Sequence, residues 1–168
     1  MTNNVQQGTG EGTLIESSNG TIIYNSRAYF QDSKRYIANS LDGGINYENF
    51  YTDKILLDDF RIGCHASMIR IPYKQIKNKF GFPLEGEGLT LFCNPHSIKR
   101  ENMAIHFSFD AGHTWTRAKT VDKGLCAYSS ICWNDITQQF YLLYETGLET
   151  PYDLGIMCAE FDIEWLLS

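Results

Sequence analysis

Two stretches of the chain decide its fold: Ser40-Leu41-Asp42-Gly43-Gly44-Ile45-Asn46-Tyr47 and Ser108-Phe109-Asp110-Ala111-Gly112-His113-Thr114-Trp115. Both read Ser-x-Asp-x-Gly-x-x-aromatic, and each follows a β-like run. In such a turn the Asp carboxylate can accept hydrogen bonds from backbone N–H groups, and Gly permits a positive φ. The final aromatic residue packs under the turn. The pattern therefore predicts a β-unit that occurs twice.

Short apolar runs separated by turn signals predict an all-β fold with little helix. Several runs are apolar on both faces, including Leu89-Thr90-Leu91-Phe92 and Tyr141-Leu142-Leu143-Tyr144, so they belong between two other layers. Asn19-Gly20 reads as a tight hairpin turn, and Pro72–Gly88 as a solvated insertion loop whose lysines lie on the surface. The expected strands are Thr13–Glu16, Thr21–Arg27, Arg35–Ser40, Ser67–Ile71, Leu89–Cys93, Met103–Phe109, Ala127–Trp133, Gln139–Glu145 and Leu154–Phe161.

Sheets packed between neighbouring sheets are the arrangement of a β-propeller. A four-stranded blade takes about 40–50 residues, so 168 residues hold about three blades. Closed propellers have four to eight blades. We therefore expect a flexible lead-in over residues 1–10 and a partial propeller over residues 11–168, whose two open faces are apolar.

The composition and the net charge limit the kinds of partner that the chain can bind. A net charge of −6 argues against a general nucleic-acid surface, which needs clustered basic residues. The longest apolar runs fall short of the roughly 20 residues of a membrane span, and the first residues show no signal-peptide pattern. The five cysteines form no CxxC pair, which argues against a metal site and favours buried free thiols. No cofactor is indicated, and the cellular location stays open.

Short motifs, in order along the chain, carry a family resemblance. The octapeptides match the Asp-box, and residues 11–167 resemble the C-terminal half of an exo-α-sialidase (neuraminidase), whose complete propeller has six blades. The matching segments are Glu11-Gly12-Thr13 with the strand ending in Asn25-Ser26-Arg27, Gly63-Cys64-His65-Ala66-Ser67, Asn94-Pro95 with Arg100, Cys126-Ala127-Tyr128-Ser129, Leu143-Tyr144-Glu145, and the ending Phe161 to Leu166. The family reads Gly-Cys-Gln-Gly-Ser in the second segment and has Asn where Gly10 stands.

The resemblance implies a role for each matching residue. Arg27 and Arg100 would be two members of an arginine triad that grips the carboxylate of sialic acid, a task that suits the guanidinium fork. Tyr128 would be the nucleophile and Glu11 its general base. Glu145 would support the third arginine, which this chain lacks. The implied substrate is a sialylated glycan, cleaved with retention of configuration.

A tyrosine nucleophile has a physical reason in this family. Sialic acid carries a carboxylate on its anomeric carbon, so an anionic nucleophile would approach against like charge, whereas a neutral phenol does not. A phenol has an ordinary pKa of about 10 and therefore needs a base in contact.

Half of the family's site is missing from the sequence. The first half of the propeller should supply an Arg-Ile-Pro segment with the first triad arginine and an Asp that acts as general acid. Arg70-Ile71-Pro72 has the letters but not the position. We therefore expect the isolated chain to be inactive and its partner to be the missing N-terminal half. Two alternatives stay open: a non-catalytic Asp-box module that binds glycan or protein, and a degenerate product. His65, His106 and His113 are expected to be structural or exposed.

Overall fold

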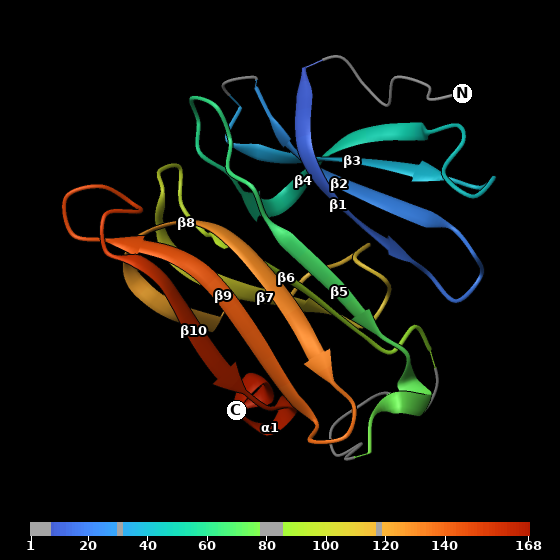
Figure 1. Cartoon of the computed structure of the whole chain (residues 1–168). Coiled ribbons are helices and arrows are strands. Elements are labelled where there is room, and N and C mark those ends of the chain that lie inside the picture. The colour runs from blue at the N-terminus through green and yellow to red at the C-terminus, as the bar shows by residue number, and fades with distance from the viewer. Residues whose placement is uncertain (1–7, 30–31, 78–85, 117–118) are drawn as a thin grey trace.

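The computed structural model describes residues 8–29, 32–77, 86–116 and 119–168, and these residues form two antiparallel sheets (Figure 1). The first sheet has the order β1-β2-β3-β4 and the second β10-β9-β8-β7-β6-β5. A 3₁₀ turn, Tyr73–Gln75, and a short C-terminal helix, α1 (Ile163–Leu167), complete the described elements. The strands are β1 Thr9–Glu16, β2 Ile22–Ala28, β3 Lys34–Ser40, β4 Glu48–Leu57, β5 Ser67–Ile71, β6 Leu89–Pro95, β7 Glu101–Ser108, β8 Lys119–Asn134, β9 Gln139–Gly147 and β10 Gly155–Phe161.

The long strand β8 belongs to two units. Its first part pairs with β7, from Lys119 opposite Ile105 to Leu125 opposite Glu101. Its second part pairs with β9, and the register shifts just before Ser129. The six-stranded sheet is thus one four-stranded unit, β5–β8, continued by the three strands β8–β10. The all-β partial propeller expected from the sequence is confirmed.

Strand β6 shows why the fold is layered. All seven of its residues are buried. Leu89 and Leu91 belong to a core cluster shared with β7, β8, β9 and α1. Phe92 points the other way, into a second cluster with Ile23 and Ile37 of the first sheet. Alternate residues of one strand face opposite sides of its sheet, so β6 contributes to both cores. Leu143 of β9, expected to be covered, is instead 47% exposed.

Both octapeptides form the same hydrogen-bonded turn. The Asp42 carboxylate accepts from the backbone N–H groups of Asn46 (2.9 Å) and Ile45 (3.1 Å). The Ser40 hydroxyl accepts from the Gly44 N–H at 2.9 Å and donates to Asp42 at 2.8 Å. The backbone N–H of Asn46, with its side-chain amide and the Ser40 hydroxyl, lowers the pKa of Asp42 to about 2.

The second copy, between β7 and β8, repeats these contacts. Asp110 accepts from the Thr114 N–H at 2.8 Å, and Ser108 accepts from the Gly112 N–H at 2.8 Å. Trp115 closes the turn and is buried against Phe92, with ring centroids 5.8 Å apart. The two turns join β3 to β4 and β7 to β8, so the same β-unit occurs twice, as the sequence predicts.

Several local predictions need correction. Strand β4 was not among the expected strands. The β1–β2 connection spans residues 17–21, longer than a two-residue turn, with Gly20 at φ 86°. Within the supposed solvated loop, Ile76 is buried in the core, while residues 78–85 lie outside the described part. Three free cysteines are buried, as expected, but Cys132 and Cys158 are exposed. Strand β1 begins at Thr9, inside the expected lead-in, of which residues 1–7 lie outside the described part.

Candidate active site

The site forms where the innermost strands of successive units lie side by side. The backbone N–H of Met68 in β5 donates to Thr13 Oγ1 of β1 at 3.2 Å. On the other side of β5, the hydroxyls of Ser67 and Ser129 are 3.0 Å apart, which ties β5 to β8. This arrangement brings the start of β1 to the middle of β8.

Glu11, Arg27 and Tyr128 form one hydrogen-bonded cluster. The Tyr128 hydroxyl donates to Glu11 Oε1 at 3.0 Å, across 117 positions of sequence. Arg27 Nη1 donates to the Tyr128 oxygen at 2.9 Å and to Glu11 Oε2. The phenol oxygen thus sits between a carboxylate that can take its proton and a guanidinium that can stabilise the negative charge left behind.

The charges in this cluster reinforce each other. Burial alone would raise the pKa of the Glu11 carboxyl, but hydrogen bonds from Arg27 and Tyr128 and the charge of Arg27 outweigh burial and lower it. For Arg27, burial would lower the pKa, but the contacts with Glu11 outweigh it and raise the value. Both groups are therefore charged near neutral pH, which leaves Glu11 able to accept a proton.

Arg100, in the β6–β7 connection, lies against the tyrosine ring. Its guanidinium carbon is 5.4 Å from the centre of the Tyr128 ring. Arg100 Nη2 donates to the Gly63 carbonyl at 3.2 Å, and its Nε lies 3.9 Å from Asp59. Two guanidinium groups thus flank Tyr128.

Both arginines depend on the loop of residues 58–64, which joins β4 to β5. The Ile62 carbonyl accepts from Nε and Nη2 of Arg27 at 3.0 and 2.8 Å. The buried Asp58 holds this loop, because its Oδ1 accepts from the Cys64 N–H at 2.7 Å. Asp58 in turn is paired with buried Arg35 at 2.9 Å. None of Asp58, Asp59 and Arg35 was among the predicted site residues. The only available signal was an acidic doublet after the apolar run Ile55 to Leu57.

Glu145 contacts the backbone of Tyr128. Its Oε2 accepts from the backbone N–H of Tyr128 at 3.0 Å. Glu145 and Tyr128 line a pocket of about 340 Å³, together with His65, Leu143 and Ile156. The pocket opens beside β10, at the edge of the sheet.

His65 contacts the site, although it was expected to be structural or exposed. Its ring centroid is 5.3 Å from that of Tyr128, and burial lowers its pKa. It stands where the family reads Gln, so a departure from the family motif was the signal. His106 is buried and shares a 3.1 Å hydrogen bond with His96, whereas His113 is exposed.

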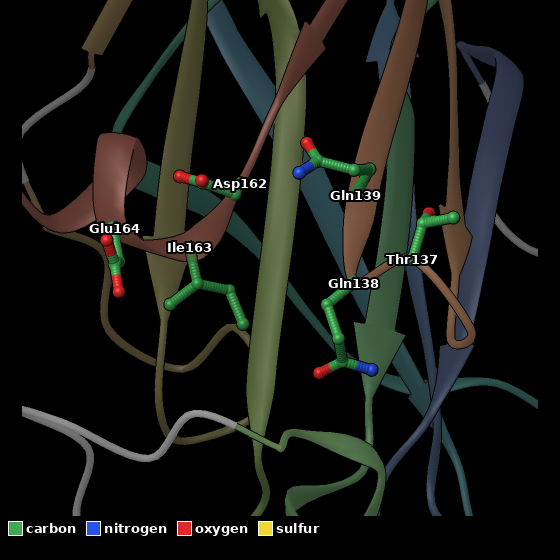
Figure 2. A pocket seen from close by; sticks show the side chains of 6 residues that line it. All are labelled: Thr137, Gln138, Gln139, Asp162, Ile163 and Glu164. Atoms are coloured by element: carbon green, nitrogen blue, oxygen red, sulfur yellow. The ribbon is translucent and has the colours of Figure 1, made fainter.

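Other features lie apart from this cluster. A pocket of about 170 Å³ sits between the β8–β9 turn and the start of α1, where Gln138, Gln139 and Asp162 line it (Figure 2). Arg70 is paired with Glu87 at 3.1 Å and does not join the cluster. Among the described residues, no group of three or more metal-binding side chains occurs, and no helix is long and apolar enough to cross a membrane.

The comparisons with known proteins include several sialidases. No family model matches the chain. The sialidase of Micromonospora viridifaciens is 32% identical over 166 residues, covering 95% of this chain and 22% of that protein. A Hadza microbial sialidase matches with a TM-score of 0.77 and 23% identity, over 98% of this chain and 30% of that one. The intramolecular trans-sialidase of Ruminococcus gnavus matches with a TM-score of 0.73 and 18% identity, over 97% and 34%.

Fold and relatives together define a sialidase-like glycoside hydrolase domain, built as part of a β-propeller. The chain belongs to the sialidase family. It spans 22% of the length of the curated relative and about a third of the two solved structures.

Proposed function

We propose that this chain provides the nucleophile side of an exo-α-sialidase active site, with Tyr128 as nucleophile and Glu11 as its general base. One observation carries the proposal: the Tyr128 hydroxyl donates to Glu11 at 3.0 Å while Arg27 donates to the same oxygen at 2.9 Å. A module that only binds glycan has no need of a phenol held between a base and a cation.

In the proposed reaction, the phenol oxygen forms a bond to the anomeric carbon of the terminal sialic acid, and the bond to the leaving sugar oxygen breaks. The phenol proton passes to Glu11, and the leaving oxygen takes a proton from an acid outside these 168 residues. Water then attacks the same carbon and gives one proton to that acid, now deprotonated, while the bond to Tyr128 breaks and the phenolate recovers its proton from Glu11. Two displacements retain the configuration.

The arginines differ in how free they are to bind the sialic acid carboxylate. Arg27 already donates to Ile62, Glu11 and Tyr128. Among the described residues, the Arg100 side chain donates a single hydrogen bond, to Gly63. We therefore assign the main carboxylate contact within this chain to Arg100. Arg27 has the additional task of holding the base and the nucleophile together.

Glu145 is proposed to have two roles. Through the Tyr128 N–H it fixes the strand that carries the nucleophile. Its carboxylate also lines the pocket beside β10, so it can support an arginine from another part of the propeller. That part is proposed to be the N-terminal half, whose blades would cover the open side of β9 and β10. The exposed apolar side chains of Leu143 and Ile156 support such a contact.

The test compares the 168-residue protein with the longest natural form that contains it, using a fluorogenic 4-methylumbelliferyl sialoside. We expect turnover only from the longer form, since a missing general acid alone costs about 10²–10⁴-fold. In that form, Tyr128→Phe and Glu11→Gln should each lower kcat at least 100-fold. Tyr141→Phe, on the neighbouring strand, is the matched control and should keep kcat.

A covalent readout checks the nucleophile directly. A sialosyl fluoride with a second fluorine beside the anomeric carbon slows the breakdown of the intermediate, so mass spectrometry should find the sugar on Tyr128. An adduct on another residue, or a Tyr128→Phe variant with wild-type kcat, would refute the assignment. Robust turnover by the 168-residue protein would refute the need for a second half.

A further inference from the structure

A second, solvent-open groove is lined by Arg100, the residue that it shares with the proposed catalytic site. It consists of two adjoining pockets of about 250 and 310 Å³, which share Arg61, Arg100 and Pro151. Its walls come from the β4–β5 connection, the β6–β7 connection and the β9–β10 loop. These three segments gather at the same end of the molecule (Figure 1).

The groove is rich in cations although the whole chain carries a net charge of −6. The Arg61 side chain is 63% exposed, and Lys99, which also lines the groove, is exposed. The buried carboxylate of Asp59 lies 3.4 Å from Arg61 Nη2 and 3.9 Å from Arg100 Nε. One carboxylate therefore places two guanidinium groups side by side. Glu149 is the one acidic side chain lining this groove in the described part of the chain.

Aromatic side chains complete the groove. Phe60 and Tyr152 line it and are 39% and 57% exposed. Arg61 lies over the Phe60 ring at 5.9 Å. Aromatic rings offer apolar faces to the C–H faces of sugars, and guanidinium groups pair with carboxylate or sulfate. Aromatic walls beside clustered cations suit an acidic carbohydrate better than a neutral one.

We propose that this groove binds the sugars that follow the terminal sialic acid, and that Arg61 and Lys99 recognise an acidic substituent on them. The substituent is a carboxylate or a sulfate. Arg100 belongs to both places, since it flanks Tyr128 and lines the groove. The position of the groove relative to the cleaved bond rests on the proposed function, but binding of an acidic sugar does not.

Isothermal titration of the purified protein with three sugars tests the proposal: disialyllactose, lactose 6′-sulfate and neutral lactose. Both acidic sugars, or one of them, should bind measurably more tightly than lactose, and added salt should weaken that binding. Binding of disialyllactose identifies the substituent as a carboxylate, and binding of lactose 6′-sulfate identifies it as a sulfate.

Variants locate the binding. Arg61→Gln and Lys99→Gln should each weaken binding of the acidic sugar about three- to fivefold, and the double variant about tenfold. Glu149→Gln should strengthen it by a similar factor, because a repelling carboxylate is removed. Lys74→Gln makes the same charge change on the 3₁₀ turn and should have no effect. The four substituted side chains are exposed, so the variants should fold. Arg100 is partly covered and is left unchanged.

The outcomes separate this proposal from the proposed function. The groove is not a site for acidic sugars if neither acidic sugar binds or if lactose binds equally well. The same conclusion follows if Arg61→Gln and Lys99→Gln leave the binding unchanged. If these variants lose binding and no form of the protein hydrolyses a sialoside, the groove is supported as a binding site and the sialidase chemistry is rejected. A Tyr128→Phe protein should bind lactose 6′-sulfate, where that sugar binds, as the wild type does.

Discussion

The buried ion pair between Arg35 and Asp58 should dominate the stability of the site loop. The side chains are 0% and 2% exposed, and Arg35 Nη1 lies 2.9 Å from Asp58 Oδ2. Arg35 also donates to Asn25 at 2.8 Å and to the Cys64 carbonyl at 2.6 Å. Burial lowers the pKa of Arg35 and raises that of Asp58, while their mutual attraction opposes both shifts. Each partner is therefore costly to bury without the other.

The expected magnitude follows from that mutual dependence. Asp58→Asn keeps the shape, and its oxygen can still accept from the Cys64 N–H, but it leaves the Arg35 charge uncompensated. Breaking a buried pair in this way costs about 3–5 kcal/mol. Arg35→Met strands the Asp58 charge and should cost a similar amount. The double variant removes both charges, so it should cost far less than the sum of the two singles, with a coupling of about 3 kcal/mol.

Urea unfolding followed by tryptophan fluorescence measures all four proteins of this cycle at pH 7. Because the Asp58 loop carries the carbonyls that hold Arg27 and Arg100, both single variants should also lose the site geometry. A cost below about 1 kcal/mol for Asp58→Asn, or single-variant costs that add in the double variant, would show that the pair does not hold the loop.

Two further predictions concern pH and backbone. Burial lowers the pKa of His106 to about 4, so between pH 6.5 and 4 the unfolded chain binds a proton that the folded chain excludes. Stability should be complete above pH 6.5 and fall by about 3 kcal/mol as the pH drops to 4. Urea midpoints across this range check it: His106→Gln should flatten the curve and His113→Gln should not, and a flat wild-type curve would contradict it. Gly63 has φ 67°, and an added Cβ would lie 2.9 Å from Arg27 Cβ. Gly63→Ala should cost about 1–3 kcal/mol more than Gly43→Ala, where φ is 75° but nothing lies within 4 Å; equal costs in thermal unfolding would rule out the close contact.

The sequence predicts a strand most clearly where both faces of that strand are buried. β6 was predicted because its residues are apolar on both faces, and the structure places them in two cores. β4 was missed because eight of its ten positions are not buried and its apolar residues do not alternate. Asn49 in this strand has φ 55°, and Asp53 accepts from the backbone N–H of Ile55 at 2.7 Å, so turn-like geometry interrupts the strand. An irregular edge strand leaves no period for a sequence pattern to show.

The site residues came from family resemblance and not from any periodicity. Glu11 and Tyr128 are 117 positions apart, and no local pattern links residues whose contact depends on three strands packing side by side. Asp58 and Asp59 were missed for a related reason. Their structural role depends on cations that the fold places beside them, and these partners, Arg35 and Arg100, are distant in sequence.

The loop of residues 58–64 separates two effects that would otherwise be confused. Its inward side carries the Ile62 and Gly63 carbonyls and Asp58, which fix Arg27 and Arg100 beside Tyr128. Its outward side carries Arg61, whose exposed side chain reaches the groove. A change at Arg61 should therefore alter which sugars bind while the geometry around Tyr128 stays intact. A change at Asp58 should disturb both, because it releases the backbone on which both sides depend. Comparing the two variants in one binding assay distinguishes recognition in the groove from simple misplacement of the loop.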